Sequence, residues 1–178
     1  DTVHALVGEN GAGKSTLMKT LYGMQKPDSG TISVDGQERT FRSPSDAIAV
    51  GIGMVFQHFM LADNFTTLEN VVLGAEKLHG IADSARQEFK GISDRYGFGL
   101  DPDQLVERLG VADRQRLEIL KVLYRGAKVI ILDEPTAVLV PQEVDALFEN
   151  LRDLRKHGHS VLFISHKLDE VLAIADDI

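Results

Sequence analysis

The sequence has no cysteine and no tryptophan, and aromatic residues make up only 6% of its 178 positions. Without cysteine, a disulfide framework and thiolate chemistry are both excluded, which fits a reducing compartment. Apolar runs are short: stretches such as Val129–Leu132 and Val161–Ile164 hold four residues. A membrane-spanning helix needs about 20 apolar residues. We therefore expect any role at a membrane to depend on docking to a partner.

An excess of positive charge is equally absent. The formal net charge is −8, and acidic and basic residues are interspersed rather than gathered in blocks. Proteins that follow nucleic-acid phosphates carry a stripe or patch of lysine and arginine, so we expect no nucleic-acid partner. Apolar residues make up 43% of the chain, which is enough for one globular domain with a core of its own.

Strand-like and helix-like segments alternate in the first third of the chain. The apolar run Thr2–Val7 leads into a glycine-rich turn, and helical spacing of apolar residues begins at Lys14. Alternation over 31–34, followed by the dipeptide Asp35-Gly36, predicts a β-hairpin. Ile52–Phe56 predicts a further strand.

The middle of the chain has a helical pattern instead. Thr66 and Glu69 have the spacing of a capping box, and two or three helices are predicted after them, with a break at Gly80. Strand character returns at Val129–Leu132 and Ser160–Ile164, with a helix between these strands. Strands that alternate with helices predict an α/β fold with a parallel sheet. The hairpin predicts a small antiparallel β part beside this sheet, and the helical middle of the chain predicts an inserted helical subdomain.

A phosphate-binding motif lies between the first predicted strand and the first predicted helix. Residues 8–15 match G-x-x-x-x-G-K-[ST], the P-loop or Walker A motif of nucleotide hydrolases. Its glycines let backbone N–H groups close around phosphate oxygens, beside the positive end of a helix. Lys14 is expected to reach the β- and γ-phosphates, and Ser15 to offer its hydroxyl to Mg²⁺. The predicted nucleotide-binding residues of this motif are Gly8, Glu9, Asn10, Gly11, Ala12, Gly13, Lys14, Ser15 and Thr16.

Two adjacent carboxylates end the apolar strand that begins at Val129. In P-loop nucleotide hydrolases the first acid at this place holds the Mg²⁺ shell, which makes Asp133 a candidate nucleotide and metal contact. A second acid beside it polarises the attacking water, and Glu134 is the candidate for this catalytic role. Alone, an acidic strand end is weak evidence, but beside the P-loop it predicts a Walker B motif.

Taken together, these motifs resemble the ATP-binding cassette of ABC proteins over essentially all 178 residues. Gln57 matches the family's Q-loop glutamine, which implies a nucleotide contact, a Mg²⁺ ligand and a sensor of the permease. His166 matches the family's switch histidine, which implies a catalytic contact with the γ-phosphate. The family's signature loop acts on the nucleotide of the opposite cassette. Its place is taken here by Leu109, Gly110, Val111, Ala112 and Asp113.

The local sequence is similar to that of ATPases of importers of simple sugars and, especially, nucleosides, at residues 8–19, 58–61, 67–70, 118–125, 133–139 and 141–143. In that group one chain carries two cassettes and the second usually has an impaired P-loop, so the intact Lys14 indicates the first cassette. The resemblance implies ATP and Mg²⁺ as cofactors. It also implies three partners: a second cassette in the same full-length chain, a transmembrane permease and, indirectly, a substrate-binding protein. The implied location is peripheral, on the cytoplasmic face of the cell membrane.

The same resemblance implies a domain plan. Residues 1–178 are expected to form a partial nucleotide-binding domain, with an α/β catalytic core at about 1–65 and 127–178. Residues 66–126, which include the signature loop, are expected to form the helical subdomain. The aromatic residue that stacks on adenine is expected upstream of the sequence and the family's final strands downstream, so we expect a piece truncated at both ends.

Three positions depart from the family pattern. Gly110 replaces the signature serine, Ala112 replaces a glycine, and Val140 stands where the D-loop aspartate is usual. These positions normally serve the nucleotide of the opposite cassette, so the changes are expected to affect that partner site. They leave open a regulatory cassette that hydrolyses little ATP. A soluble ABC protein acting on ribosomes or DNA is a further alternative. The acidic net charge and the importer-like sequence argue against it.

The remaining histidines predict no chemistry. His157-Gly158-His159 lacks a further cluster of ligands, and we expect a solvated turn there rather than a metal site. His4, His58 and His79 are interpreted as structural or surface residues.

Overall fold

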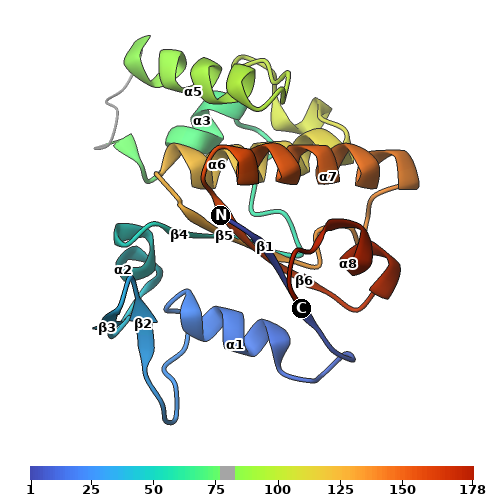
Figure 1. Cartoon of the computed structure of the whole chain (residues 1–178). Coiled ribbons are helices and arrows are strands. Elements are labelled where there is room, and N and C mark those ends of the chain that lie inside the picture. The colour runs from blue at the N-terminus through green and yellow to red at the C-terminus, as the bar shows by residue number, and fades with distance from the viewer. Residues whose placement is uncertain (77–82) are drawn as a thin grey trace.

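A parallel sheet forms the centre of the molecule. The computed structural model describes residues 1–76 and 83–178 (Figure 1), so Gly80 and His79 lie outside the described residues. The sheet has the order β1-β6-β5-β4, and each neighbouring pair is parallel. This arrangement confirms the predicted α/β class with a parallel sheet. Its strands are β1 (Val3–Val7), β4 (Ile52–Val55), β5 (Val129–Asp133) and β6 (Ser160–Ser165).

Alternate side chains of the sheet feed two separate cores, as the period of a β-strand requires. On one face, α1 (Lys14–Leu21) and α2 (Pro44–Ala49) cover a cluster that includes Ile131 and Ile164. On the other face, α7 (Pro141–Lys156) packs over a cluster that includes Phe163. Figure 1 shows the sheet between these two helical layers. Both faces are therefore largely buried, which explains why the strands are short and predominantly apolar.

The small antiparallel part is the hairpin predicted from the sequence. It consists of β2 (Ile32–Val34) and β3 (Gln37–Arg39). The two turn residues, Asp35 and Gly36, have φ values of 51° and 73°. Positive φ at both central residues is what a two-residue type I′ turn demands, and Asp-Gly provides it at low steric cost.

Helices occupy the middle of the chain and lie together over one face of the sheet (Figure 1). Thr66 caps the helix α3 (Thr67–Val72), as its spacing predicted: its side chain accepts from the Glu69 N–H at 3.2 Å, and Glu69 Oε2 accepts from the Thr66 N–H at 2.7 Å. None of the described helices is long and apolar enough to cross a membrane. The helices of this block are α3 (Thr67–Val72), α5 (Asp83–Arg95), the short 3₁₀ helix η1 (Val106–Arg108) and α6 (Val111–Tyr124).

Candidate active site

The candidate residues meet at one edge of the sheet. Because all four strands are parallel, their carboxyl ends share this edge, where ligands of open α/β sheets bind. The P-loop follows β1, Glu134 follows β5, His166 follows β6, and Gln57 lies two residues beyond β4. A pocket of about 350 Å³ opens among them. Its lining residues are Asn10, Gly11, Gly13, Lys14, Ser15, Thr16, Gln57, Glu134, Ala137 and His166.

The P-loop backbone is shaped to present N–H groups to an anion. Gly11 and Gly13 have φ values of 84° and 90°, a region that disfavours any residue with a Cβ. Gly13 is also the N-cap of α1, and no side chain caps this helix end. The first-turn N–H groups of a helix have no intrahelical acceptor, and the helix dipole adds partial positive charge there. The loop therefore offers a built cradle for phosphate oxygens.

The Lys14 ammonium lies over this loop without a counter-charge. Its Nζ donates to the carbonyl oxygens of Gly8 at 2.7 Å and Glu9 at 3.0 Å. Among the described residues, no acidic side chain forms an ion pair with it. A cation held by neutral carbonyls beside an N–H cradle fits a negatively charged ligand.

Hard oxygen ligands lie next to the cradle. The hydroxyl of Ser15, the first helical residue after Lys14, donates to Asp133 Oδ1 at 2.9 Å. This bond joins residues 118 positions apart and fixes the carboxylate, which is 5% exposed, beside Ser15; Asp133 itself does not line the pocket. Hydroxyl, carboxylate and amide oxygens are ligands that Mg²⁺ accepts, and the Gln57 side chain lines the same pocket. The residues present thus fit a magnesium site.

Glu134 and His166 form the second half of the pocket. His166 Nδ1 is 2.9 Å from both carboxylate oxygens of Glu134, and because a carboxylate only accepts, Nδ1 is the donor. The Glu134 side chain is 10% exposed, whereas His166 is 45% exposed at the pocket mouth. Glu134 has a φ of 49°, and its N–H donates to the Ile164 carbonyl at 3.0 Å. A residue other than glycine held at positive φ stores strain, and such strain gathers at functional sites.

A pair of residues that the sequence reading missed supports this half of the pocket. Thr136, two residues after Glu134, donates its hydroxyl to Glu170 in α8 (Leu168–Ile174). Lys167 Nζ donates to the other oxygen of Glu170 at 2.9 Å. These bonds join the loop after β5 to the helix after His166. The only signal in the sequence is position, because both residues closely follow a candidate catalytic residue.

The signature loop lies away from this pocket. Leu109–Asp113 runs from the end of η1 into the first turn of α6, with Gly110 as the N-cap. The guanidinium of Arg116 pairs with Asp113 at 2.9 Å. Of the loop residues, none lines the pocket of the P-loop. Their action on a partner's nucleotide stays a prediction.

The histidine turn differs from its prediction at one position. His159 is not a solvated residue: its Nε2 lies 2.8 Å from the Tyr96 hydroxyl, and its Nδ1 lies 3.0 Å from the Ala127 carbonyl. Burial lowers the pKa of the His159 imidazole, partly opposed by the Ala127 carbonyl. The reason is a tertiary contact: Tyr96, the residue after α5, packs against His159 just before β6. Within the described ranges, no cluster of three or more possible His, Asp or Glu ligands occurs.

Comparison with known proteins assigns these features to one family. Residues 1–137 match the family model described as ABC transporter. The chain is 50% identical over 179 residues to the nucleoside import ATP-binding protein NupA of Lactococcus lactis subsp. cremoris (strain MG1363), covering 99% of this chain and 35% of that protein. It is 47% identical to the ribose import ATP-binding protein RbsA 3 of Rubrobacter xylanophilus, with 99% and 36% covered. The chain thus spans about a third of the length of these curated relatives.

Solved structures agree in fold. CbiO1 of Clostridium perfringens, described as part of the ABC transporter complex cbiONQ, is 30% identical with a TM-score of 0.85, covering 98% of this chain and 71% of that one. The ADP conformation of MJ1267, an ATP-binding cassette of an ABC transporter, is 26% identical with a TM-score of 0.86, covering 98% and 74%.

Proposed function

This chain belongs to the ABC transporter family, and on that premise we propose that its pocket binds ATP with Mg²⁺ and hydrolyses it to drive solute import through a separate membrane permease. The observation that carries the proposal is the single edge at which Lys14, Asp133, Glu134 and His166 meet. One half of this edge is suited to phosphate and metal. The other half holds a carboxylate suited to activating water.

The P-loop residues bind and orient the triphosphate. The N–H groups of Gly8–Gly13 donate hydrogen bonds to the β-phosphate, and Lys14 exchanges its bonds to the loop carbonyls for bonds to β- and γ-phosphate oxygens. Ser15, Asp133 and Gln57 would hold Mg²⁺. When bound, the ion neutralises charge that develops on the phosphates and aligns them.

Glu134 orients the attacking water and accepts its proton. The water oxygen forms a bond to the γ-phosphorus, the bond from that phosphorus to the β,γ-bridging oxygen breaks, and ADP and inorganic phosphate leave. His166 holds the Glu134 carboxylate through Nδ1 and stands at the pocket mouth, where the γ-phosphate is expected. Preorganised groups of this kind stabilise the transition state without reorganisation during the reaction.

Simple sugars or nucleosides are the proposed solutes. The support comes from the relatives, which are described as nucleoside and ribose import ATP-binding proteins. We further propose a second cassette in the same full-length chain, a substrate-binding protein acting indirectly, and a peripheral position on the cytoplasmic face of the membrane. Solute selection itself is assigned to the permease and the binding protein.

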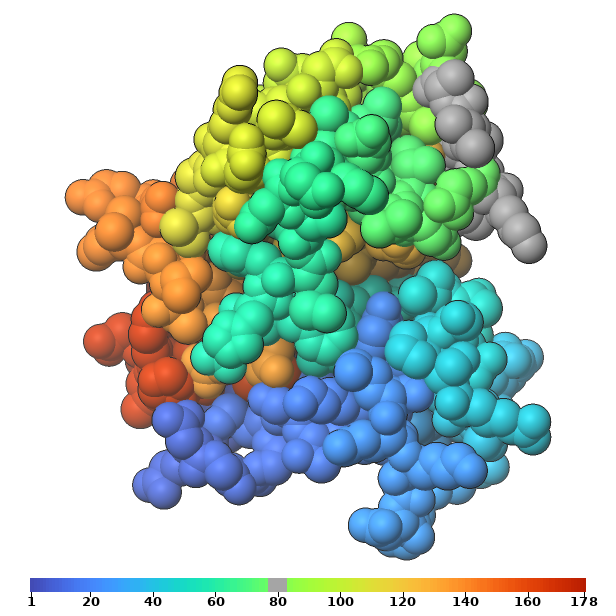
Figure 2. Space-filling model, turned by 180° about the vertical axis from the view of Figure 1, so that it is seen from behind, coloured from blue at the N-terminus to red at the C-terminus, as the bar shows by residue number. Residues whose placement is uncertain are grey.

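We place the permease contact in a groove of about 630 Å³ next to the Gln57 segment. Figure 2 shows this face, with the residues that follow β4 lying between α1 and the helical block. The lining is largely apolar, and Met60 and Leu73 at its rim are 65% and 53% exposed. Exposed apolar surface of this kind marks a site of protein interaction. Its continuity with Gln57 favours the permease as the occupant.

Replacing Glu134 with Gln tests the proposal. Glutamine keeps the size of the side chain but is a poor base, so ATP binding should persist while hydrolysis falls about 10²- to 10⁴-fold. Both quantities are measured on the full-length protein, by calorimetry and by phosphate release. In cells that lack the protein, the wild type should restore solute uptake and Glu134→Gln should not. A variant that turns over ATP at the wild-type rate would refute the assignment, and a wild-type ATPase without effect on uptake would favour a non-transport role.

A further inference from the structure

The segment from Gln57 to Asp63 crosses from the phosphate pocket to the permease groove without forming a helix or strand. No helix or sheet ladder pairs the backbone groups of such a segment, so side chains or water must supply their hydrogen-bond partners. Met60, three residues beyond Gln57, receives both of its partners from side chains of α6. Its N–H donates to Glu118 Oε1, and its carbonyl accepts from Lys121 Nζ at 2.8 Å.

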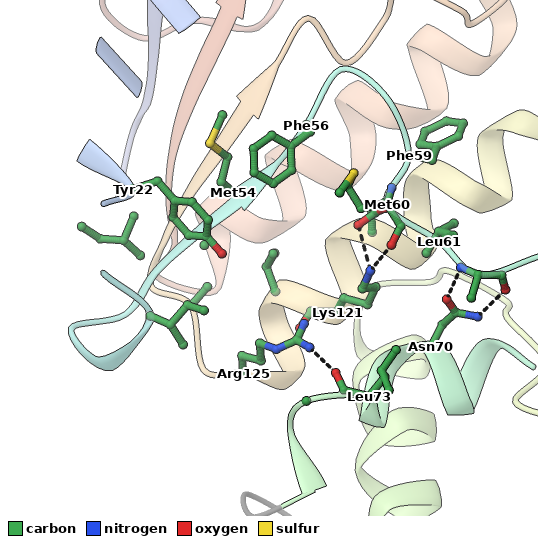
Figure 3. A pocket seen from close by; sticks show the side chains of 18 residues that line it. Tyr22, Met54, Phe56, Phe59, Met60, Leu61, Asn70, Leu73, Lys121 and Arg125 are labelled. Atoms are coloured by element: carbon green, nitrogen blue, oxygen red, sulfur yellow. Dashed lines mark hydrogen bonds and ion pairs between the residues drawn. The ribbon is translucent and has the colours of Figure 1, made fainter. Parts of the chain in front are cut away.

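Figure 3 shows Lys121 beside Met60, and the Lys121 ammonium contacts both the Met60 carbonyl and the Glu118 carboxylate. Glu118 and Lys121 are one helical turn apart, and Lys121 Nζ lies 3.4 Å from Glu118 Oε2. Their side chains are only 6% and 13% exposed. We call these two residues the Met60 clamp.

Burial on this scale is unusual for a glutamate and a lysine, which are almost never fully buried unless paired. Burial lowers the pKa of the Lys121 ammonium, although the Glu118 carboxylate opposes this change. A buried ion pair is weak evidence for stability, because well-packed apolar residues of similar size are often as stabilising or more so. The two backbone bonds to Met60 therefore point to a role in positioning.

A second attachment lies two residues further along the segment. Asn70 of α3 accepts from the Ala62 N–H at 2.8 Å and donates to the Ala62 carbonyl at 3.0 Å. Figure 3 shows both bonds. The outer part of the segment is thus fixed to two helices, and its inner end carries Gln57 into the phosphate pocket. Because consecutive Cα atoms are about 3.8 Å apart, the Gln57 Cα lies within about 11 Å of the Met60 Cα, so fixing Met60 limits the range that Gln57 can reach.

We infer that Glu118 and Lys121 are positioning residues for ATP hydrolysis, which set the place of Gln57 in the phosphate pocket by holding both backbone groups of Met60. The inference rests on the proposed ATPase function. It assigns α6, whose first turn carries part of the signature loop, a second task at the permease groove. Neither residue touches the pocket itself.

The test is the double variant Glu118→Leu with Lys121→Met in the full-length protein. Both replacements are apolar and of similar size, so the core remains filled and no buried charge is left unpaired. The thermal midpoint and the KM for ATP should stay close to the wild-type values. The kcat should fall about tenfold, because an interaction needed in the transition state is lost. Exchange of the Met60 amide should accelerate by about ten- to a hundredfold, as expected for loss of a hydrogen bond to a charged group.

The matched control is Asp153→Leu with Lys156→Met. This pair has the same i,i+3 spacing on α7, but its side chains are 42% and 65% exposed. Its kcat and its Met60 exchange should equal those of the wild type. If the clamp variant does not fold, Glu118→Gln serves instead: its amide oxygen still accepts from the Met60 N–H, so protection of that amide should persist while kcat falls less.

The outcomes separate the two proposals. A wild-type protein without ATPase activity would overturn the proposed function, and the clamp's role in hydrolysis with it. An active wild type whose kcat is unchanged in the folded clamp variant would overturn the clamp inference alone. With Glu118→Gln as the test, unprotected Met60 exchange or a kcat loss above about tenfold would do the same.

Discussion

The single charge of Lys14 has the largest expected effect on ligand binding. Replacing Lys14 with Ala removes charge-assisted bonds to phosphate that contribute about 1.5–3 kcal/mol. The affinity of the full-length protein for ATP should weaken at least about tenfold, measured by titration calorimetry. Lys26→Ala, an exposed lysine outside the pocket, is the matched control and should bind normally. If Lys14→Ala binds ATP as tightly as the Lys26→Ala control, the assignment of this loop as the ATP-binding P-loop is wrong.

His159 should make the stability of the fold depend on pH. Burial lowers the pKa of its imidazole in the folded state, with His157 and Arg95 acting in the same direction. The unfolded chain then binds the proton more readily, so stability is full above the ordinary histidine pKa of about 6.5 and is lost as pH falls below it. The thermal midpoint should drop from pH 7.5 to pH 5.5, and His159→Gln should show a smaller drop. Parallel curves for both proteins would contradict the burial effect.

The pocket residues could be predicted from the sequence, whereas residues held in place by tertiary contacts could not. Lys14, Glu134 and His166 follow predicted strands, and parallel strands bring such positions to one edge whatever lies between them. Glu118 and His159 carry no such signal. Their roles depend on which distant side chain or backbone group reaches them, and that is a property of tertiary packing.

Among the elements, β4 and α6 are packed too closely to accept any side chain at Gly53. A Cβ on Gly53 would lie 2.7 Å from the Cβ of Val122 and 3.0 Å from that of Ala127. Gly53→Ala should therefore destabilise the fold by about 1–3 kcal/mol, as overpacking does. Gly91 is the contrasting case, since it lies within α5 with nothing within 4 Å of an added Cβ.

Gly91→Ala should stabilise the fold by about 0.5–1 kcal/mol through helix propensity. Denaturant unfolding of both variants measures the two changes. If both variants change the free energy of unfolding in the same direction, the space around each glycine does not determine the effect of the substitution.

Element positions followed from local chemistry, while element ends did not always do so. The hairpin turn and the capping box were predictable because a few neighbouring residues determine them. The strand predicted to include Phe56 ends at Val55. Phe56 instead packs edge-on against Tyr22, with ring centroids 6.0 Å apart. That contact joins β4 to the end of α1, and no window of sequence contains both.

At the scale of the whole molecule, the altered signature loop predicts two unequal sites. We propose that this loop faces the nucleotide of an opposite cassette, where Gly110 lacks a hydroxyl that could bind the phosphate. One such bond contributes about 1.5–3 kcal/mol. A Cβ on Gly110 would meet nothing within 4 Å, so a serine fits at this position. Restoring Gly110→Ser with Ala112→Gly should strengthen ATP-driven closure about ten- to a hundredfold.

The measurement is dimer closure and hydrolysis at each site of the full-length protein, with and without the double restoration. The site completed by this loop should be slow in the wild type and faster after restoration. If both sites already hydrolyse ATP at equal rates and the restoration changes neither, the prediction of two unequal sites is wrong.

The pairing of β1 with β6 has a consequence for folding during synthesis of the chain. Val7 lies beside Ser165, so 158 residues separate the end of the strand that carries the P-loop from its partner. At about 5–20 residues per second, this length takes roughly 10–30 s to synthesise. During that interval the nascent chain carries a complete P-loop without Glu134 or His166 beside it. Newly made chains can therefore assemble the pocket only after β6 has been synthesised, and until then β1 lacks its partner strand.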